Sequence, residues 1–265
     1  MMSADPNGDY ADVNGIRMYY EVHGAGKPLV LIHGGGSTIS TSFGRVLPHF
    51  ARTRMAIAVE MQAHGRTSDR DEPVSFRQDA DDITELLRQL EITSADIFGF
   101  SNGGQTGIEL AIRHPDLVRS LIVASGFHRR DCAPAGFWTG FETAQLSEMP
   151  QIYQDEFIKL GGDRDALLNM FKKDVERMRN FSGWSDDDLR SITCPTMVVA
   201  GNHDLPSPEK AVEMFRLFPD AQLVILPGAH GTYMGEAMSA NADSRVPELF
   251  AAMIDEFLDA QDTAR

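Results

Sequence analysis

The sequence predicts an α/β fold in which a mostly parallel sheet is flanked by helices. Short apolar segments alternate along the chain with segments of helical periodicity, as expected when strands are joined by right-handed helical crossovers. The apolar segments are continuous rather than alternating, which is typical of strands covered on both faces. Six such strands are expected, at Leu29–Ile32, Met55–Val59, Asp96–Phe100, Leu121–Ala124, Thr196–Ala200 and Leu223–Leu226.

A hairpin is predicted before the first of these strands. Asn14-Gly15 is a dipeptide that tolerates the positive φ angles of a two-residue turn, and apolar residues alternate with polar ones over residues 16–22. Two helix starts are also recognisable. Ser75 with Gln78 forms a capping-box pattern, and Ser207-Pro208 supplies an N-cap followed by proline at the first helical position.

The stretch from Phe127 to about Arg190 interrupts this alternation, because it contains helical patterns but no strand-like run. It is too long for a plain connection between two strands. We therefore expect two parts. Residues 1–126 and 191–265 form an α/β core, and residues 127–190 form a helical cap over the carboxyl edge of the sheet.

Composition and charge limit the partners of the chain. The formal net charge of −15 over 265 residues argues against nucleic acid or an anionic membrane, so a small-molecule substrate is expected, and a homodimer is left open. No signal-like or membrane-spanning segment is recognisable, and two isolated cysteines, Cys132 and Cys194, fit a reducing compartment. We expect a cytoplasmic protein. The scattered histidines lack metal-ligand spacing, so neither a metal nor a cofactor is expected.

The segment Gly99-Phe100-Ser101-Asn102-Gly103 follows an apolar strand and opens a helical stretch. A tight strand-to-helix turn holds a serine in a strained backbone conformation and needs small residues on both sides. In this context the Gly-x-Ser-x-Gly pattern resembles the nucleophile elbow of the α/β-hydrolase superfamily. The resemblance extends from Tyr10 to about Leu258 and implies an α/β-hydrolase fold with an eight-stranded, mostly parallel sheet.

In that superfamily the serine is followed along the chain by an acid and then by a histidine. Asp204 follows the predicted strand Thr196–Ala200, and His230 follows the last predicted strand. The resemblance therefore implies a Ser101–Asp204–His230 triad, in which His230 takes the serine proton and Asp204 orients the imidazole. Each residue also has a structural interpretation. The serine and the aspartate suit helix caps, and the histidine suits a hydrogen-bonded loop.

The segment His33-Gly34-Gly35-Gly36 follows the strand Leu29–Ile32, where related hydrolases place a backbone donor for the oxyanion. By resemblance, the two donors are the N–H groups of Gly35 and Asn102. A glycine-rich turn after a strand also suits phosphate, but the Gly-x-x-x-x-Gly-Lys-Ser/Thr pattern is absent from the sequence. His64 and Arg66, after a neighbouring strand, are predicted to hold loops beside the site.

The substrate pocket is expected to combine loop residues with bulky side chains of the cap. Its predicted members are Gly36, Phe127, Trp138, Phe141, Tyr233 and Met234. Most of the cap's remaining apolar bulk is expected to form the internal packing of an added helical layer. That bulk comprises Met149, Tyr153, Phe157, Met170 and Trp184.

Together these features predict a cofactor-free serine hydrolase that cleaves carboxylic esters or lactones through an acyl-enzyme. Two alternatives stay open. One is another enzyme with the same triad, either a C–C bond hydrolase or a perhydrolase of the haloperoxidase type. The other is a ligand receptor without turnover, because the fold alone does not decide the function.

Overall fold

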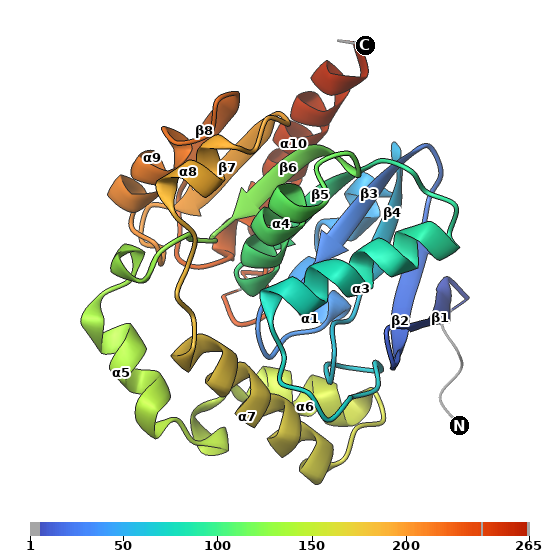
Figure 1. Ribbon diagram of the computed structural model, residues 1–265, viewed down its shortest axis with the longest axis vertical. Helices are drawn as coiled ribbons and strands as arrows, with labels where there is room; N and C mark the ends of the chain where they lie inside the picture. The colour runs from blue at the N-terminus through green and yellow to red at the C-terminus, as the bar shows by residue number, and fades with distance from the viewer. Residues whose placement is uncertain (1–5, 240, 264–265) are drawn as a thin grey trace.

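The computed structural model describes residues 6–239 and 241–263. Its strands are β1 (Gly8–Val13), β2 (Ile16–His23), β3 (Lys27–Ile32), β4 (Arg54–Val59), β5 (Ala95–Phe100), β6 (Val118–Ala124), β7 (Thr196–Gly201) and β8 (Ala221–Leu226). They form one eight-stranded sheet in the order β1-β2-β4-β3-β5-β6-β7-β8 (Figure 1). β2 is antiparallel to β1 and β4, and the pairings from β4 to β8 are parallel. The predicted α/β fold is confirmed.

Helices cover both faces of this sheet. One face is packed by α3 (Phe76–Gln89), α4 (Asn102–Arg113), α8 (Asp186–Arg190) and α9 (Pro208–Phe215). The other face is packed by α1 (Ile39–Phe43), α2 (Leu47–Phe50) and α10 (Val246–Thr263). Because successive strand residues point to opposite faces, Val30 and Ile32 of β3 lie in the first core, whereas Leu29 and Leu31 lie in the second.

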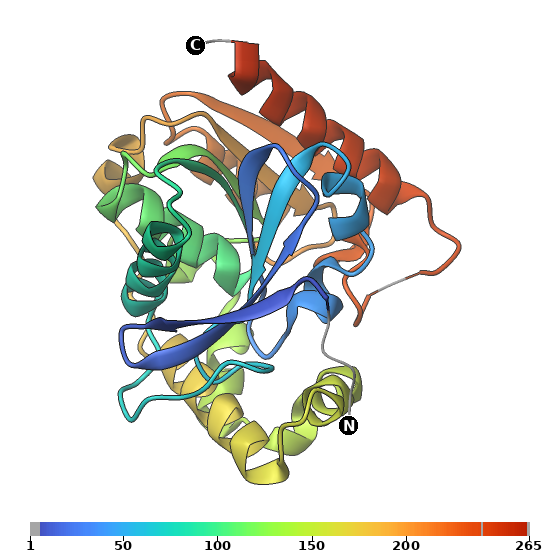
Figure 2. The same cartoon turned by 90° about the vertical axis from the view of Figure 1, so that its right-hand side faces the viewer.

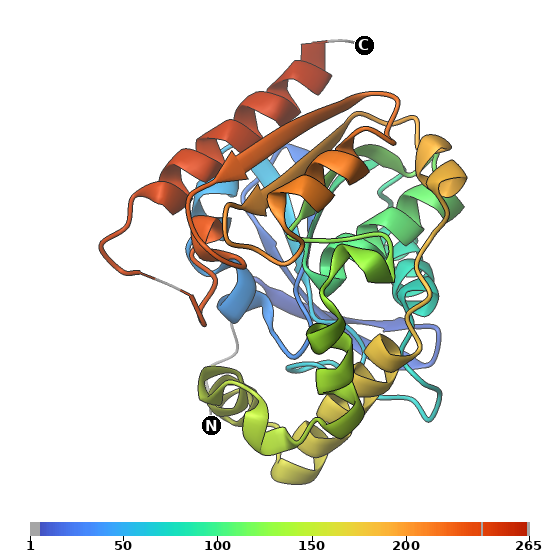
Figure 3. The same cartoon turned by 90° about the vertical axis from the view of Figure 1, so that its left-hand side faces the viewer.

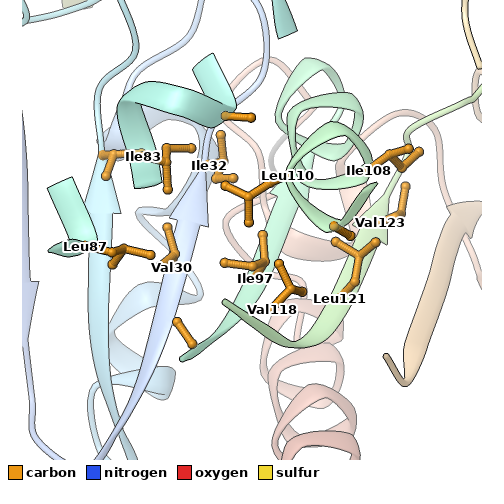
Figure 4. Packing of buried hydrophobic residues seen from close by; sticks show 14 of the residues in the cluster. Val30, Ile32, Ile83, Leu87, Ile97, Ile108, Leu110, Val118, Leu121 and Val123 are labelled. Carbon is orange, nitrogen blue, oxygen red and sulfur yellow. The ribbon is translucent and has the colours of Figure 1, made fainter. Parts of the chain in front are cut away.

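The first core shows how the helix that follows the predicted elbow is fixed. Ile108 and Leu110 of α4 lie over Ile97 of β5 and over residues of β6, beside α3 (Figure 4). All of these side chains are fully buried. Burial of such side chains stabilises a fold by roughly 1.5–3 kcal/mol each, so α4 is held firmly against the sheet.

The local turn and capping predictions have mixed outcomes. Asn14 (φ 43°) and Gly15 (φ 89°) form the predicted hairpin turn between β1 and β2. Ser75 caps α3 by accepting the Gln78 N–H, but the Gln78 side chain donates to an aspartate one turn on and leaves the capping box open. Ser207 precedes α9 as predicted, yet its hydroxyl donates to a glutamate side chain and caps no backbone N–H.

Three helices lie between β6 and β7 in the chain and away from both sheet faces. These are α5 (Ala135–Thr143), α6 (Gln151–Lys159) and α7 (Arg164–Arg179), which we call the inserted helices. They gather at one end of the molecule in all three ribbon views (Figure 1, Figure 2 and Figure 3). The division into a core and a cap at residues 127 and 190 stays a prediction. In the part of the chain that the structure describes, no helix combines the length and apolar character needed to cross a membrane.

Candidate active site

Ser101 lies at the sharp turn between β5 and α4. Its backbone has a positive φ angle (φ 52°, ψ −120°), a conformation that a non-glycine residue adopts only where the surroundings enforce it. The flanking glycines are required by contact. A Cβ on Gly99 would lie 2.0 Å from the Gly103 carbonyl oxygen, and one on Gly103 would lie 2.1 Å from the Ile32 carbonyl oxygen. The Gly-x-Ser-x-Gly pattern therefore follows from the close approach of the α4 start to β5 and β3.

His230 and Asp204 meet beyond the carboxyl ends of β8 and β7. His230 Nδ1 lies 2.7 Å from Asp204 Oδ1. Because a carboxylate only accepts, Nδ1 carries the proton and Nε2 is left as an acceptor, which is the tautomer that a general base needs. The imidazole also packs against the Phe100 ring, with 5.0 Å between centroids. Ser101 and His230 line the same cavity, but no hydrogen bond joins their side chains within residues 6–239 and 241–263.

Four groups hold the Asp204 carboxylate in place. Besides His230, the backbone N–H groups of Gly201 (2.8 Å) and Leu205 (2.7 Å) donate to it. Ser125 donates its hydroxyl to the second carboxylate oxygen and accepts from the Tyr233 hydroxyl at 2.7 Å. Burial, and then the charge of Asp204, raises the pKa of Tyr233 well above its usual value, so the phenol keeps its proton. This donor chain fixes the carboxylate that orients the imidazole, and no local sequence pattern predicts it.

The glycine loop after β3 lies against the start of α4. A Cβ on Gly35 would lie 2.4 Å from Asn102 Nδ2, so the structure brings the two predicted oxyanion donors together. Within the described residues, neither the Gly35 N–H nor the Asn102 N–H has a hydrogen-bond acceptor. Both residues line the cavity that contains Ser101. Two free backbone donors beside a serine are the arrangement that stabilises a tetrahedral oxyanion.

Two neighbouring histidines support this loop, and their pKa values are shifted in opposite directions. His33 donates from Nδ1 to the Gly34 carbonyl (2.7 Å) and accepts the Met61 N–H at Nε2 (3.0 Å), so its ring is neutral. Burial, followed by the nearby charge of His64, lowers the pKa of His33 to about 3. His64 Nδ1 lies 2.8 Å from the Gln62 carbonyl oxygen, and its Nε2 lies 3.0 Å from the Asp174 carboxylate and 3.2 Å from the Gly36 nitrogen. Burial opposes its charge, but Asp174 outweighs burial and raises the pKa of His64.

Asp174 connects an inserted helix, α7, to the glycine loop. One of its carboxylate oxygens accepts the Gly36 N–H at 2.6 Å and His64 Nε2 at 3.0 Å, and the other accepts from Arg177. Arg177 in turn reaches Asp79 of α3 at 2.8 Å. Burial opposes the charge on Asp174, yet Arg177 and then His64 lower the pKa of that carboxyl well below its usual range. The four ionisable side chains thus form one buried network beside the loop.

A second contact joins the inserted helices to the loop that carries His230. The Tyr153 hydroxyl of α6 donates to the buried carboxylate of Glu236 at 2.7 Å. The backbone N–H of Met238 binds the other carboxylate oxygen at 3.0 Å. Burial raises the pKa of Glu236, so this carboxyl depends on its two donors when it is charged.

The cavity measures about 580 Å³ and lies between the sheet edge and the inserted helices. Its lining is mostly aromatic, aliphatic or thioether. These residues are Phe127, Phe137, Phe141, Met149, Tyr153, Met170, Phe171, Val175, Met178 and Leu205. Among the described residues that line it, the acidic ones are Glu148 and Asp174, and there is no lysine or arginine. The cavity therefore suits a neutral, largely apolar ligand.

Three of the predicted pocket residues, Gly36, Phe127 and Phe141, line this cavity. The other three do not. Trp138 stacks on Phe181, with 5.8 Å between centroids, and its indole N–H donates to a backbone carbonyl. Tyr233 and Met234 are fully buried beneath the site, where they pack against residues of α10.

Sequence reasoning also missed one face of α7. Met170, Asp174 and Met178 recur at a spacing of four residues and all line the cavity, together with Phe171 and Val175. The apolar spacing was a signal that this face is covered, but not that a cavity covers it. An aspartate in the middle of that face was the feature that could have indicated a buried polar network.

Comparison with known protein families agrees with the geometry of the site. A family model described as "Alpha/beta hydrolase family" matches residues 29–241. The chain belongs to this family and is a hydrolase.

The relatives and structural neighbours of this chain are named for different substrates. The 2-hydroxymuconate semialdehyde hydrolase of Pseudomonas sp. (strain CF600) is 38% identical over 212 residues, which cover 72% of this chain and 75% of that protein. A pimeloyl-[acyl-carrier protein] methyl ester esterase of Neisseria meningitidis is 26% identical over 88% of this chain and 94% of that protein. The crystal structure of the enol-lactonase from Burkholderia xenovorans LB400 superposes with a TM-score of 0.74 at 21% identity, covering 95% of this chain and all of that one. Esters, lactones and C–C bonds are therefore all represented among its relatives and structural neighbours.

Proposed function

We propose that this chain is a cofactor-free serine hydrolase that cleaves neutral carboxylic esters or lactones through an acyl-enzyme on Ser101. The observation that carries the proposal is the His230–Asp204 pair, 2.7 Å apart, whose imidazole lines the same cavity as Ser101 at its strained turn. In the neutral imidazole this pair leaves Nε2 as the acceptor, and Nε2 has no hydrogen-bond partner among the described residues. An unprotonated imidazole beside a serine is the requirement for nucleophilic catalysis by a hydroxyl.

The residues have separate roles in this reaction. Ser101 Oγ attacks the carbonyl carbon while His230 Nε2 takes its proton, and Asp204 stabilises the imidazolium that forms. The oxyanion of the tetrahedral intermediate accepts from the N–H groups of Gly35 and Asn102. His230 then gives the proton to the leaving alkoxide, and the acyl group stays on Ser101. In the second half of the reaction, His230 Nε2 takes a proton from water, whose oxygen attacks the acyl carbon. The carboxylic acid then leaves, and His230 returns the proton to Ser101 Oγ.

The lining of the cavity supports esters and lactones over substrates that carry a carboxylate. A bound carboxylate needs a cation or several donors, and burying it without them is costly. The described residues that line the cavity include no lysine or arginine, while Glu148 and Asp174 are both acids. Arg177, which lies behind this wall, is already engaged by Asp174 and Asp79.

C–C bond hydrolysis is the second candidate, because a relative at 38% identity is named for a muconate semialdehyde, which carries a carboxylate. The same triad serves both reactions, so the triad does not separate them. The charge of the substrate does. A neutral ester is expected to be turned over with a higher kcat/KM than a vinylogous diketone that bears a carboxylate, and the reverse order would favour the second candidate.

The nucleophile is tested with a fluorophosphonate probe and peptide mapping. The probe is expected to label Ser101, and Ser101→Ala is expected to abolish both labelling and hydrolysis of p-nitrophenyl esters. Ser191→Ala is the matched control, since Ser191 is exposed at the end of α8 and binds only a backbone carbonyl there. An adduct on another residue, or full turnover by Ser101→Ala, would overturn the proposal.

A further inference from the structure

Asn102 occupies the position after the serine, and its side chain as well as its backbone belongs to the cavity. The residue begins α4, is 8% exposed and lines the cavity beside Ser101. Its Nδ2 atom lies over Gly35, 2.4 Å from the place of a Cβ on that glycine. The carboxamide therefore lies beside Gly35, which supplies the other backbone N–H to the oxyanion in the proposed reaction.

The carboxamide has no hydrogen-bond partner among the described residues, and its polar atoms are accessible from the cavity. Within residues 6–239 and 241–263 it makes no side-chain hydrogen bond, and only the backbone carbonyl of Asn102 is engaged, by the Thr106 hydroxyl at 3.2 Å. The nearest carboxylate oxygen, Asp174 Oδ2, is already occupied by the Gly36 N–H and His64. An amide that lines a largely apolar cavity and has no partner in the protein is free to donate to a ligand there.

We propose that the Asn102 carboxamide is a catalytic residue that supplies a third donor, through Nδ2, to the oxyanion formed at Ser101. The inference rests on the proposed function. A carbonyl oxygen in the ground state offers two lone pairs, which the two backbone N–H groups satisfy, whereas a tetrahedral oxyanion offers three. The third donor therefore acts mainly in the transition state and raises kcat more than it lowers KM.

The first test compares Asn102→Leu, which keeps a similar volume without the donor, with Gln105→Leu. Gln105 is the matched control, because it is a buried amide one turn further along α4 with no partner, yet it is not among the described residues that line the cavity. Loss of one oxyanion donor lowers kcat by about 10²–10³-fold in known hydrolases. We expect a fall of that order for Asn102→Leu with KM little changed, and no fall for Gln105→Leu.

Inhibitor affinity provides a readout that a merely structural change would not move. An alkyl trifluoromethyl ketone forms a hemiketal oxyanion with a serine, whereas the corresponding alcohol does not. Asn102→Leu is expected to weaken ketone binding by the same factor as kcat/KM and to leave alcohol binding unchanged. Asn102→Asp, which keeps the shape and replaces the donor with an acceptor, is expected to show the same loss if Asn102→Leu folds poorly.

Two results would overturn the inference. If both Asn102 variants keep kcat and ketone affinity within about threefold of the unmodified chain, the carboxamide does not contact the oxyanion. If both ligands weaken equally, the side chain shapes the cavity and is not a donor. Failure of the proposed function has a different signature, because the unmodified chain would then turn over no ester and bind no ketone.

Discussion

Replacement of Asp174 by asparagine tests whether the buried network beside the glycine loop is held together by charge. The variant keeps the shape of the side chain but removes the charge that faces His64 and Arg177. Breaking a buried ion pair by removing one partner costs roughly 3–5 kcal/mol. Arg177 keeps Asp79 at 2.8 Å, so we expect the lower end, about 3 kcal/mol, or roughly 6–12 °C in Tm for a chain of this size.

The pH dependence of this loss gives a sharper test. The folded pKa of His64 is raised above its value in the unfolded chain. The stability from its charged form is therefore present below about pH 6.5 and is lost as the pH rises through the folded value. Asp174→Asn removes the group that raises this pKa. Its destabilisation is thus expected to be larger at about pH 6 than at about pH 9, because the contribution of the charged form falls as the pH rises through the folded pKa.

Urea unfolding at the two pH values, followed by circular dichroism, measures both effects. Asp165→Asn is the control, because Asp165 lies on the same helix, is exposed and takes part in no ion pair within the described residues. The reasoning is refuted if Asp174→Asn loses less than about 1 kcal/mol, the range of an exposed ion pair. It is also refuted if the loss is the same at both pH values.

Three further changes probe other parts of the site. Asp204→Asn should lower kcat about 10⁴-fold by analogy with the serine-protease triad, and near-normal ester turnover would assign the acid elsewhere. Burial, and then Arg129, lowers the pKa of His128 to about 4. The unfolded chain therefore binds this proton first, and the protein should lose about 2 kcal/mol of stability between pH 7 and pH 5, a loss that urea unfolding should show to be smaller in His128→Gln. Tyr153→Phe should cost about 1–3 kcal/mol by leaving buried Glu236 short of a donor, and an unchanged urea midpoint would show that the contact contributes nothing.

The strands could be predicted because a parallel sheet buries both faces, but their first residues could not. β4 begins at Arg54 and β6 at Val118, both ahead of the predicted starts. Arg54 is buried because α10, some 200 residues later, places Asp259 and Asp262 against its guanidinium. Arg119 of β6 is paired in the same way with Asp96 and Asp262. In a sequence, a charged residue favours the prediction of an exposed loop, because the distant partners that allow its burial cannot be recognised there.

In the candidate site, too, residues placed by local pattern could be predicted, whereas residues placed by distant partners could not. Ser101, Asp204 and His230 could be predicted because each follows a strand, and the carboxyl ends of parallel strands share one edge of the sheet. Asp174 could not, because its partners Gly36 and His64 are 138 and 110 residues away along the chain. The bulk of Trp138 predicts a pocket residue, but a buried indole N–H needs an acceptor. This N–H donates to a backbone carbonyl within the aromatic cluster, which holds the side chain away from the cavity.

Asp174 raises an electrostatic question, because a carboxylate beside a developing oxyanion would repel it. Its nearest oxygen lies 3.3 Å from the place of a Cβ on Gly35, one of the proposed oxyanion donors. The surrounding charges offset this effect. His64, whose pKa is raised, and Arg177 both bind the carboxylate directly, so their positive charge offsets the charge that Asp174 presents to the cavity. Asp79, whose pKa burial raises to about 6, completes the balance on the far side of Arg177. His64 and Arg177 are both engaged by carboxylates within the network, so neither is available to bind an anionic substrate.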